Sequence, residues 1–150
     1  AATVANRGHY YIPHVVKEIQ NAELDSIYTT PQYTMVDEKW YKYAVEGMRA
    51  AVTGGTCRGA AIPGIEVCGK TGTAENRGRD HSVFMGFAPM NEPKIAVSVY
   101  VENGGYGAVY GVPIGGLIME QYLNDSLSAA SKVKAQNIQN SIINYGKQER

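Results

Sequence analysis

Four consecutive residues, Lys70, Thr71, Gly72 and Thr73, combine a cation, two hydroxyls and a position with no side chain. An ammonium can hold or move a proton within a hydrogen-bond network, and hydroxyls can bind a carboxylate. The glycine lets a ligand's backbone approach closely. The residues just before suit an extended backbone and follow a Pro-Gly turn signal. The sequence therefore predicts a strand that runs along the rim of a cleft and binds a carboxylate-bearing ligand.

The same stretch allows two other interpretations. Residues 64–71 fit the G-x-x-x-x-G-K-[ST] pattern of a phosphate-binding loop, which needs a helix opening at the Lys-Thr pair. The interior of that supposed loop, Ile-Glu-Val-Cys, suits a strand instead, and Gly72 and Gly78 make a poor helix start. Nucleotide binding is therefore disfavoured. The remaining alternative is an ordinary strand whose Lys and Thr side chains face water.

Lys-Thr-Gly is also the third signature of the serine penicillin-recognising enzymes, which pair it with S-x-x-K and S-x-N motifs. Residues 62–75 (Ile-Pro-Gly-Ile-Glu-Val-Cys-Gly-Lys-Thr-Gly-Thr-Ala-Glu) and 80–89 (Asp-His-Ser-Val-Phe-Met-Gly-Phe-Ala-Pro) widen the match. Residues 1–123 thus resemble the C-terminal part of the transpeptidase domain of class B penicillin-binding proteins, most of all the penicillin-binding protein 2 group. The polar tail, residues 124–150, is not covered by the resemblance.

The resemblance implies a serine acyl-enzyme mechanism. The family's serine attacks the penultimate carbonyl of a D-alanyl-D-alanine peptidoglycan stem peptide, and an amine of a neighbouring strand resolves the acyl-enzyme into a cross-link. β-Lactams mimic the donor peptide. Lys70 would belong to the proton-transfer network, while the hydroxyls of Thr71 and Thr73 would bind the substrate carboxylate. The backbone N–H of Thr73 would be an oxyanion donor, and Gly72 would let the peptide lie along the strand.

The resemblance also implies partners and a location. It implies no cofactor, no metal and no nucleic acid, but does imply the remaining N-terminal part of the same protein and glycosyltransferase and elongation partners. The full protein would be anchored in the bacterial inner membrane, with its catalytic domain in the periplasm. Two rivals stay open: a D,D-carboxypeptidase or β-lactamase of the same superfamily, and a non-catalytic sensor module that binds β-lactam or peptide.

The two upstream motifs of the family have no acceptable match. No S-x-N triplet occurs, and the S-x-x-K at Ser131 to Lys134 follows the Lys-Thr-Gly motif and lies in the polar tail. About one such match is expected by chance in a chain of this length. The uncapped start of the chain reads as the last turns of a helix ended by Gly8. We therefore expect an incomplete domain that is catalytically inactive alone.

The length and composition of the chain are compatible with one hydrophobic core and with no strong overall electrostatic field. Fourteen basic residues balance fourteen acidic ones among 150, which gives no attraction to nucleic acid. No apolar run is long enough to span a bilayer. Cys57 and Cys68 flank the Pro-Gly turn and are either a periplasmic disulfide or two buried thiols.

Three histidines could suggest chemistry but are better explained by structure. His9 and His14 have no clustered Cys or carboxylate at ligand spacing, so we expect packing or surface roles. Asp80 and His81 are adjacent on a predicted strand, and adjacent strand residues point apart. An acid–base pair is therefore disfavoured there.

The expected fold class is α+β, an αβα arrangement of three antiparallel strands flanked by helices, as in penicillin-binding protein/β-lactamase-like transpeptidases. Besides the Lys-Thr-Gly strand, residues 83–88 and 95–101 suit strands joined by short links. Because strict alternation sends Lys70 and Thr71 to opposite faces, both can serve one site only from an edge strand. The strand 95–101 should have an unpaired edge too.

Two helices should cover this sheet. Asp37 caps one that runs to about Thr53, and Pro113 opens the other. Residues 124–150 could form a surface helix or be disordered. The apolar face of the first helix is predicted to hold Trp40, Tyr41, Ala44, Val45, Met48, Ala51 and Val52, and that of the second Ile114, Leu117, Ile118 and Tyr122.

Overall fold

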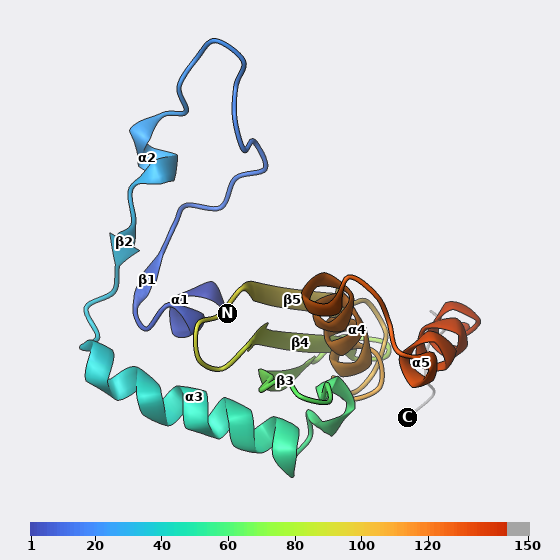
Figure 1. Ribbon diagram of the computed structural model, residues 1–150. Helices are drawn as coiled ribbons and strands as arrows, with labels where there is room; N and C mark the ends of the chain where they lie inside the picture. Colours follow the sequence, from blue (N-terminus) through green and yellow to red (C-terminus); the bar gives the residue numbers. More distant parts are fainter. Residues whose placement is uncertain (144–150) are drawn as a thin grey trace.

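A three-stranded antiparallel sheet lies at the centre of the computed structural model, which describes residues 1–143 (Figure 1). Its strands are β3 (Cys68–Ala74), β4 (His81–Ala88) and β5 (Ile95–Val101), in the order β3-β4-β5. The predicted meander and α+β class are confirmed. Within the described residues, β3 and β5 each pair only with β4, so both outer edges lack a strand partner, as the sequence predicted.

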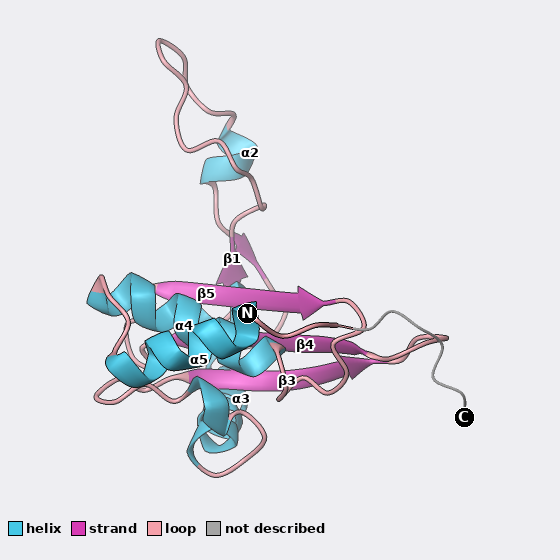
Figure 2. Ribbon diagram, turned by 90° about the vertical axis from the view of Figure 1, so that its right-hand side faces the viewer, coloured by secondary structure: helices cyan, strands magenta, loops and turns pink. Residues whose placement is uncertain are grey.

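The register sorts the side chains of the sheet between two faces. Thr71 lies opposite Phe84, and Phe84 lies opposite Val99. Opposed residues of antiparallel strands share a face. Phe84 and Val99 belong to the core cluster that includes Val112 and Met119. Helix α4 (Gly111–Asn124) therefore covers this face, which Figure 2 shows from the helix side.

The opposite face packs against α1 (Ala2–Ala5) and α3 (Glu38–Thr53). Phe87 and Cys68 share a second buried cluster with Val45 of α3 and Ala5 of α1. The predicted cap is present, because the Asp37 carboxylate accepts a 3.1 Å hydrogen bond from the Lys39 N–H.

The predicted apolar face of α3 is only partly right. Tyr41, Val45 and Val52 are buried, but Trp40 and Ala44 are exposed. The Trp40 ring stacks on the exposed Tyr43 ring at 6.0 Å between centroids and forms a surface pair rather than core.

Helix α4 buries a different face from the one that the sequence predicts. Its buried side chains include Val112 and Met119, whereas Ile118 and Tyr122 are exposed. Glycines explain the difference, since they let the helix approach its neighbours closely. A Cβ at Gly115 would lie 2.3 Å from the Phe84 ring.

Residues 9–33 form a projecting arm (Figure 1). The strands β1 (His9–Tyr10) and β2 (Gln32–Tyr33) pair at its base, and the short helix α2 (Ser26–Thr29) lies farther out. From the sequence alone, the β-branched residues and Pro13 predict an extended segment over residues 9–19, and the polar composition with Pro31 predicts a loop over residues 20–34. The arm is therefore more structured than the sequence predicts.

The tail contains helix α5 (Ala129–Gln139), so the helical alternative holds for that part. Residues 144–150 lie outside the described residues. None of the helices within residues 1–143 is both long enough and apolar enough to cross a bilayer.

Candidate active-site strand

The Lys-Thr-Gly-Thr residues lie on the open edge strand β3, as predicted. Lys70 and Thr73 are exposed, and Thr71 and Gly72 are half-buried. Lys70 and Thr71 occupy a continuous strand rather than the start of a helix, so the phosphate-loop geometry is absent here. The short bridge between Ile62 and Ile65 forms the turn that leads into the strand.

The pleat places the cation and the hydroxyls on opposite faces of this edge. Lys70 lies opposite Met85, on the α3 side of the sheet. Thr71 lies opposite Phe84 and Thr73 opposite Ser82, both on the α4 side. A ligand beside the strand edge can therefore meet groups from both faces.

The Lys70 side chain folds back along its own strand. Its Nζ donates a 2.9 Å hydrogen bond to the backbone carbonyl of Thr71. Backbone groups of alternate residues on an antiparallel strand point to the same side. The backbone groups of Thr73 therefore point to the same side of β3 as the Thr71 carbonyl that Lys70 reaches.

A second segment reaches the same edge from the loop after α3. Thr56 Oγ1 lies 3.0 Å from Thr71 Oγ1, and either hydroxyl can donate. The next residue, Cys57, is completely buried and directly precedes η1 (Arg58–Ala60). Sequence reasoning missed Thr56, because the Gly54-Gly55 pair before it indicates only the end of a helix.

A glycine-rich loop supports the strand from the α4 side. A Cβ at Gly107 would lie 2.6 Å from the Gly72 carbonyl oxygen and 3.1 Å from the Thr71 Cβ. The buried Ser82 hydroxyl donates to the Tyr106 carbonyl at 2.9 Å and accepts from the Gly111 N–H at 3.0 Å. These contacts fix the loop against the strands, and only the glycine content of the loop hints at them in the sequence.

Both cysteines are buried free thiols, so the disulfide alternative is not formed. Burial raises the pKa of the Cys57 thiol, opposed by contacts with the Thr56 side chain and the Thr71 backbone and by the Lys70 charge. Burial also raises the pKa of Cys68 to about 11, against the opposing charges of Arg49 and Arg7. Neither thiol is suited to act as a nucleophile in this state.

The S-x-x-K residues of α5 are engaged elsewhere. Ser131 is buried, and its hydroxyl donates to the Glu120 carboxylate, which also accepts a 2.9 Å hydrogen bond from the Ser128 N–H. Lys134 Nζ donates to the Gly59 carbonyl at 3.1 Å. The lysine of this match is thus bound to a backbone carbonyl rather than to its serine.

The remaining polar candidates make structural contacts. His81 Nδ1 accepts a 3.0 Å hydrogen bond from the Asn103 N–H, and Asp80 accepts one from the Asn76 N–H at 3.4 Å. The His9 ring packs on Tyr33 at 5.8 Å between centroids, and the His14 ring on Tyr28 at 5.2 Å.

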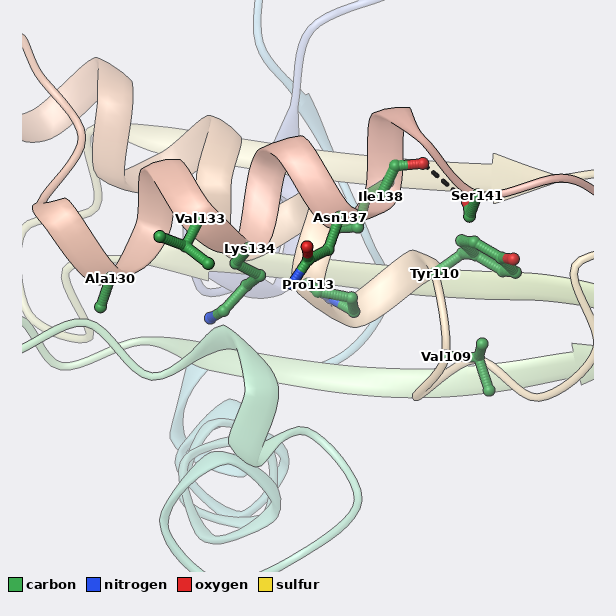
Figure 3. A pocket seen from close by; sticks show the side chains of 9 residues that line it. All are labelled: Val109, Tyr110, Pro113, Ala130, Val133, Lys134, Asn137, Ile138 and Ser141. Atoms are coloured by element: carbon green, nitrogen blue, oxygen red, sulfur yellow. Dashed lines mark hydrogen bonds between the residues drawn. The ribbon is translucent and has the colours of Figure 1, made fainter.

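A cavity of about 460 Å³ lies between α5 and the start of α4 (Figure 3). No residue of the Lys-Thr-Gly-Thr run lines it. Its lining consists of Val109, Tyr110, Pro113, Ala130, Val133, Lys134, Asn137, Ile138 and Ser141.

Comparison with known proteins identifies the family. Residues 1–120 match the model of the protein family described as "Penicillin binding protein transpeptidase domain". The chain is 33% identical over 126 residues to the peptidoglycan D,D-transpeptidase MrdA of Acinetobacter baumannii, covering 71% of this chain and 19% of that protein. The chain belongs to the penicillin-binding protein transpeptidase family, and the predicted class B resemblance is confirmed.

Solved structures agree. The crystal structure of Pseudomonas aeruginosa PBP2 in complex with WCK 5153 matches with a TM-score of 0.69 and 35% identity, over 86% of this chain and 30% of that one. The imipenem acyl-enzyme complex of penicillin-binding protein A from M. tuberculosis matches with a TM-score of 0.66 and 37% identity, over 82% and 29%. The chain thus spans less than a third of the length of these relatives.

Proposed function

We propose that this chain supplies the Lys-Thr-Gly strand, and one wall of the substrate groove, of a serine D,D-transpeptidase that cross-links peptidoglycan stem peptides. The nucleophilic serine would come from a part of the protein outside these 150 residues. Family membership supports the class of reaction. The observation that carries the proposal is the open outer edge of β3, beside which Lys70, Thr71 and Thr73 lie.

The two threonines are placed to bind one carboxylate. Thr71 and Thr73 share a face of β3, and alternate residues of a strand are about 6.6 Å apart. Two hydroxyl hydrogen bonds of about 2.7 Å, together with the width of a carboxylate, can bridge that span. The terminal carboxylate of D-alanyl-D-alanine, or the carboxylate of a β-lactam, would bind there.

The strand edge itself would hold the donor peptide. A peptide that lies beside an open strand can form backbone hydrogen bonds as an added strand. Gly72 has no side chain to obstruct it. The backbone N–H of Thr73, on the same side as the carbonyl that Lys70 reaches, would donate to the oxyanion of the tetrahedral intermediate.

Lys70 would belong to the proton-transfer network at this edge, and its positive charge would favour an anionic substrate. Its ammonium is exposed and has a flexible stem, so it can leave the Thr71 carbonyl for an incoming hydroxyl or carboxylate. As the acyl–serine bond forms and the peptide bond to the terminal D-alanine breaks, the serine proton passes through the hydrogen-bond network to the amine of the departing D-alanine. An amine then attacks the acyl-enzyme, which regenerates the serine.

The chain alone would form no acyl-enzyme. Its S-x-x-K serine, Ser131, is buried and donates to the Glu120 carboxylate, while Lys134 of the same match donates to the Gly59 carbonyl. In the full protein we expect a membrane anchor, a periplasmic catalytic domain and glycosyltransferase partners, on the basis of the family.

The test is labelling with a fluorescent penicillin. The full-length protein that carries this chain should form a covalent adduct, and Lys70→Ala and Thr71→Val should abolish most of it, whereas the isolated chain should remain unlabelled. An adduct on Ser131, or full labelling of the Lys70→Ala protein, would overturn the proposal. Release of the acyl group by water rather than by an amine acceptor would indicate a carboxypeptidase or β-lactamase, and no adduct on the full protein a non-covalent binder.

A further inference from the structure

We infer that Thr56 is a positioning residue of the carboxylate site: its hydroxyl orients the Thr71 hydroxyl toward the substrate carboxylate. This inference rests on the proposed function. It adds a residue that lies outside the Lys-Thr-Gly motif and 15 positions before Thr71 in the chain.

A donor role for Thr56 in this contact leaves the Thr71 proton for a ligand. A hydroxyl has one proton and two acceptor lone pairs. When Thr56 donates across the 3.0 Å contact, Thr71 accepts with a lone pair and directs its own proton outward. A donor chain of this kind polarises each member and strengthens the outer hydrogen bond to an anion.

The loop that carries Thr56 is held in place on both sides of it. The Gly55 N–H donates to the Ala51 carbonyl at 3.1 Å, and the Cys57 N–H donates to the same carbonyl at 2.9 Å. Cys57 is fully buried, whereas Thr56 is exposed. Thr56 therefore presents its hydroxyl at a fixed position, which is what a positioning residue requires.

The loop is also tied to the rest of the fold. The Ala60 N–H donates to the Cys57 carbonyl at 3.0 Å, and Lys134 of α5 donates to the Gly59 carbonyl at 3.1 Å. The contact between Thr56 and Thr71 lies at the surface, so it adds little to folding stability. Its effect should therefore be seen in binding and acylation rather than in the melting temperature.

The test measures acylation of the full-length protein by a penicillin. Thr56→Val removes the hydroxyl at similar volume and should lower the second-order acylation rate about fivefold. Thr56→Ser keeps the hydroxyl and should stay within about twofold of the unmodified protein. The matched control is Thr53→Val, since Thr53 is exposed and, among residues 1–143, its hydroxyl bonds only the Ala50 carbonyl of its own helix.

Two further arms separate positioning from a general structural effect. Thr56→Val should add nothing to the loss in a Thr71→Val protein, because the two residues act as a unit. The fivefold loss should also disappear for a penicillin whose carboxylate is replaced by a carboxamide. Equal rates for Thr56→Val and the unmodified protein, additive losses, or the same loss with the carboxamide would overturn the inference.

The proposed function fails in a distinguishable way. If the unmodified full-length protein forms no adduct, the transpeptidase proposal is wrong, and the inference about Thr56 falls with it. If the unmodified protein is acylated but Thr56→Val is acylated equally fast, only the inference about Thr56 is wrong.

Discussion

The Lys70 ammonium donates a 2.9 Å hydrogen bond to the backbone carbonyl of Thr71, the residue that follows it on β3. The contact links a side chain on the α3 face of the sheet to a backbone group at the outer edge. One strand thus gathers a cation, hydroxyls and backbone groups along a single margin. This arrangement resolves the alternation that otherwise separates Lys70 from Thr71.

Lys70→Ala should lower the acylation rate of the full-length protein by about 100-fold or more, the usual contribution of a positioned proton-transfer group. The melting temperature should change little, since Lys70 is exposed. Lys94→Ala is the matched control, because Lys94 is an exposed lysine in the turn before β5. Stopped-flow measurements with a chromogenic β-lactam provide the rates. Equal losses in the two variants would contradict a specific role for Lys70.

Gly115→Ala should destabilise the protein by about 1–3 kcal/mol, because its Cβ would lie 2.3 Å from Phe84 Cδ1 in the core. Gly47→Ala is the control in α3, where a Cβ would meet nothing within 4 Å, and it should stabilise by about 0.5–1 kcal/mol. Urea denaturation gives both free energies of unfolding. Equal effects of the two substitutions would mean that α4 does not pack closely on Phe84.

Docking of α5 on α4 should weaken in acid. Burial raises the pKa of the Glu120 carboxyl, but hydrogen bonds from Ser131 and Ser128 and the Lys134 charge outweigh it and leave the pKa below its usual value. In the unfolded protein the Glu120 carboxyl has the ordinary glutamate pKa of roughly 4.3. The stabilisation is therefore complete above that pH and is lost as the pH falls through the lower folded pKa.

Glu120→Gln should remove this pH dependence, and Ser131→Ala should reduce it. Hydrogen exchange of the α5 amides between pH 3 and 6, at about one-unit intervals, measures the effect against the intrinsic exchange rate. Glu46→Gln is the control, since Glu46 is an exposed carboxylate on α3. An unchanged acid profile in Glu120→Gln would show that Glu120 does not anchor α5.

The two thiols should make stability fall in alkali. The unfolded thiols lose their protons from about pH 8.5. In the folded protein, burial raises the pKa of Cys68 to about 11 and also raises that of Cys57. The contribution of the two thiols to the free energy of unfolding is thus complete below about pH 8.5 and is lost as the pH rises toward 11. A Cys57→Ala/Cys68→Ala protein should show a shallower alkaline decline in urea denaturation, and an identical decline would argue against buried thiols.

The edge strand could be predicted from the sequence because its signals are local. A turn, an apolar entry and a Lys-Thr-Gly-Thr run that would be out of place inside a sheet all lie within residues 63–73. The Asp37 cap was predictable for the same reason. Each of these features depends on residues a few positions apart.

The errors arise where packing depends on residues that carry no hydrophobic signal. The buried side of α4 contains Gly115 and Gly116, so the apolar residues Ile118 and Tyr122 suggested the wrong face. The contact between Thr56 and Thr71 was not predictable, because it joins the end of one helix to a strand that follows a separate turn. Only the tertiary fold brings these hydroxyls together.

The most direct test of the Lys-Thr-Gly assignment is a crystal structure of the full-length protein acylated by a penicillin. We predict that the penicillin carboxylate lies within about 3 Å of the hydroxyls of Thr71 and Thr73, and that the acyl oxygen lies about 2.7–3.1 Å from the Thr73 backbone nitrogen. A bound acyl group whose carboxylate and carbonyl both lie away from β3 would contradict the assignment.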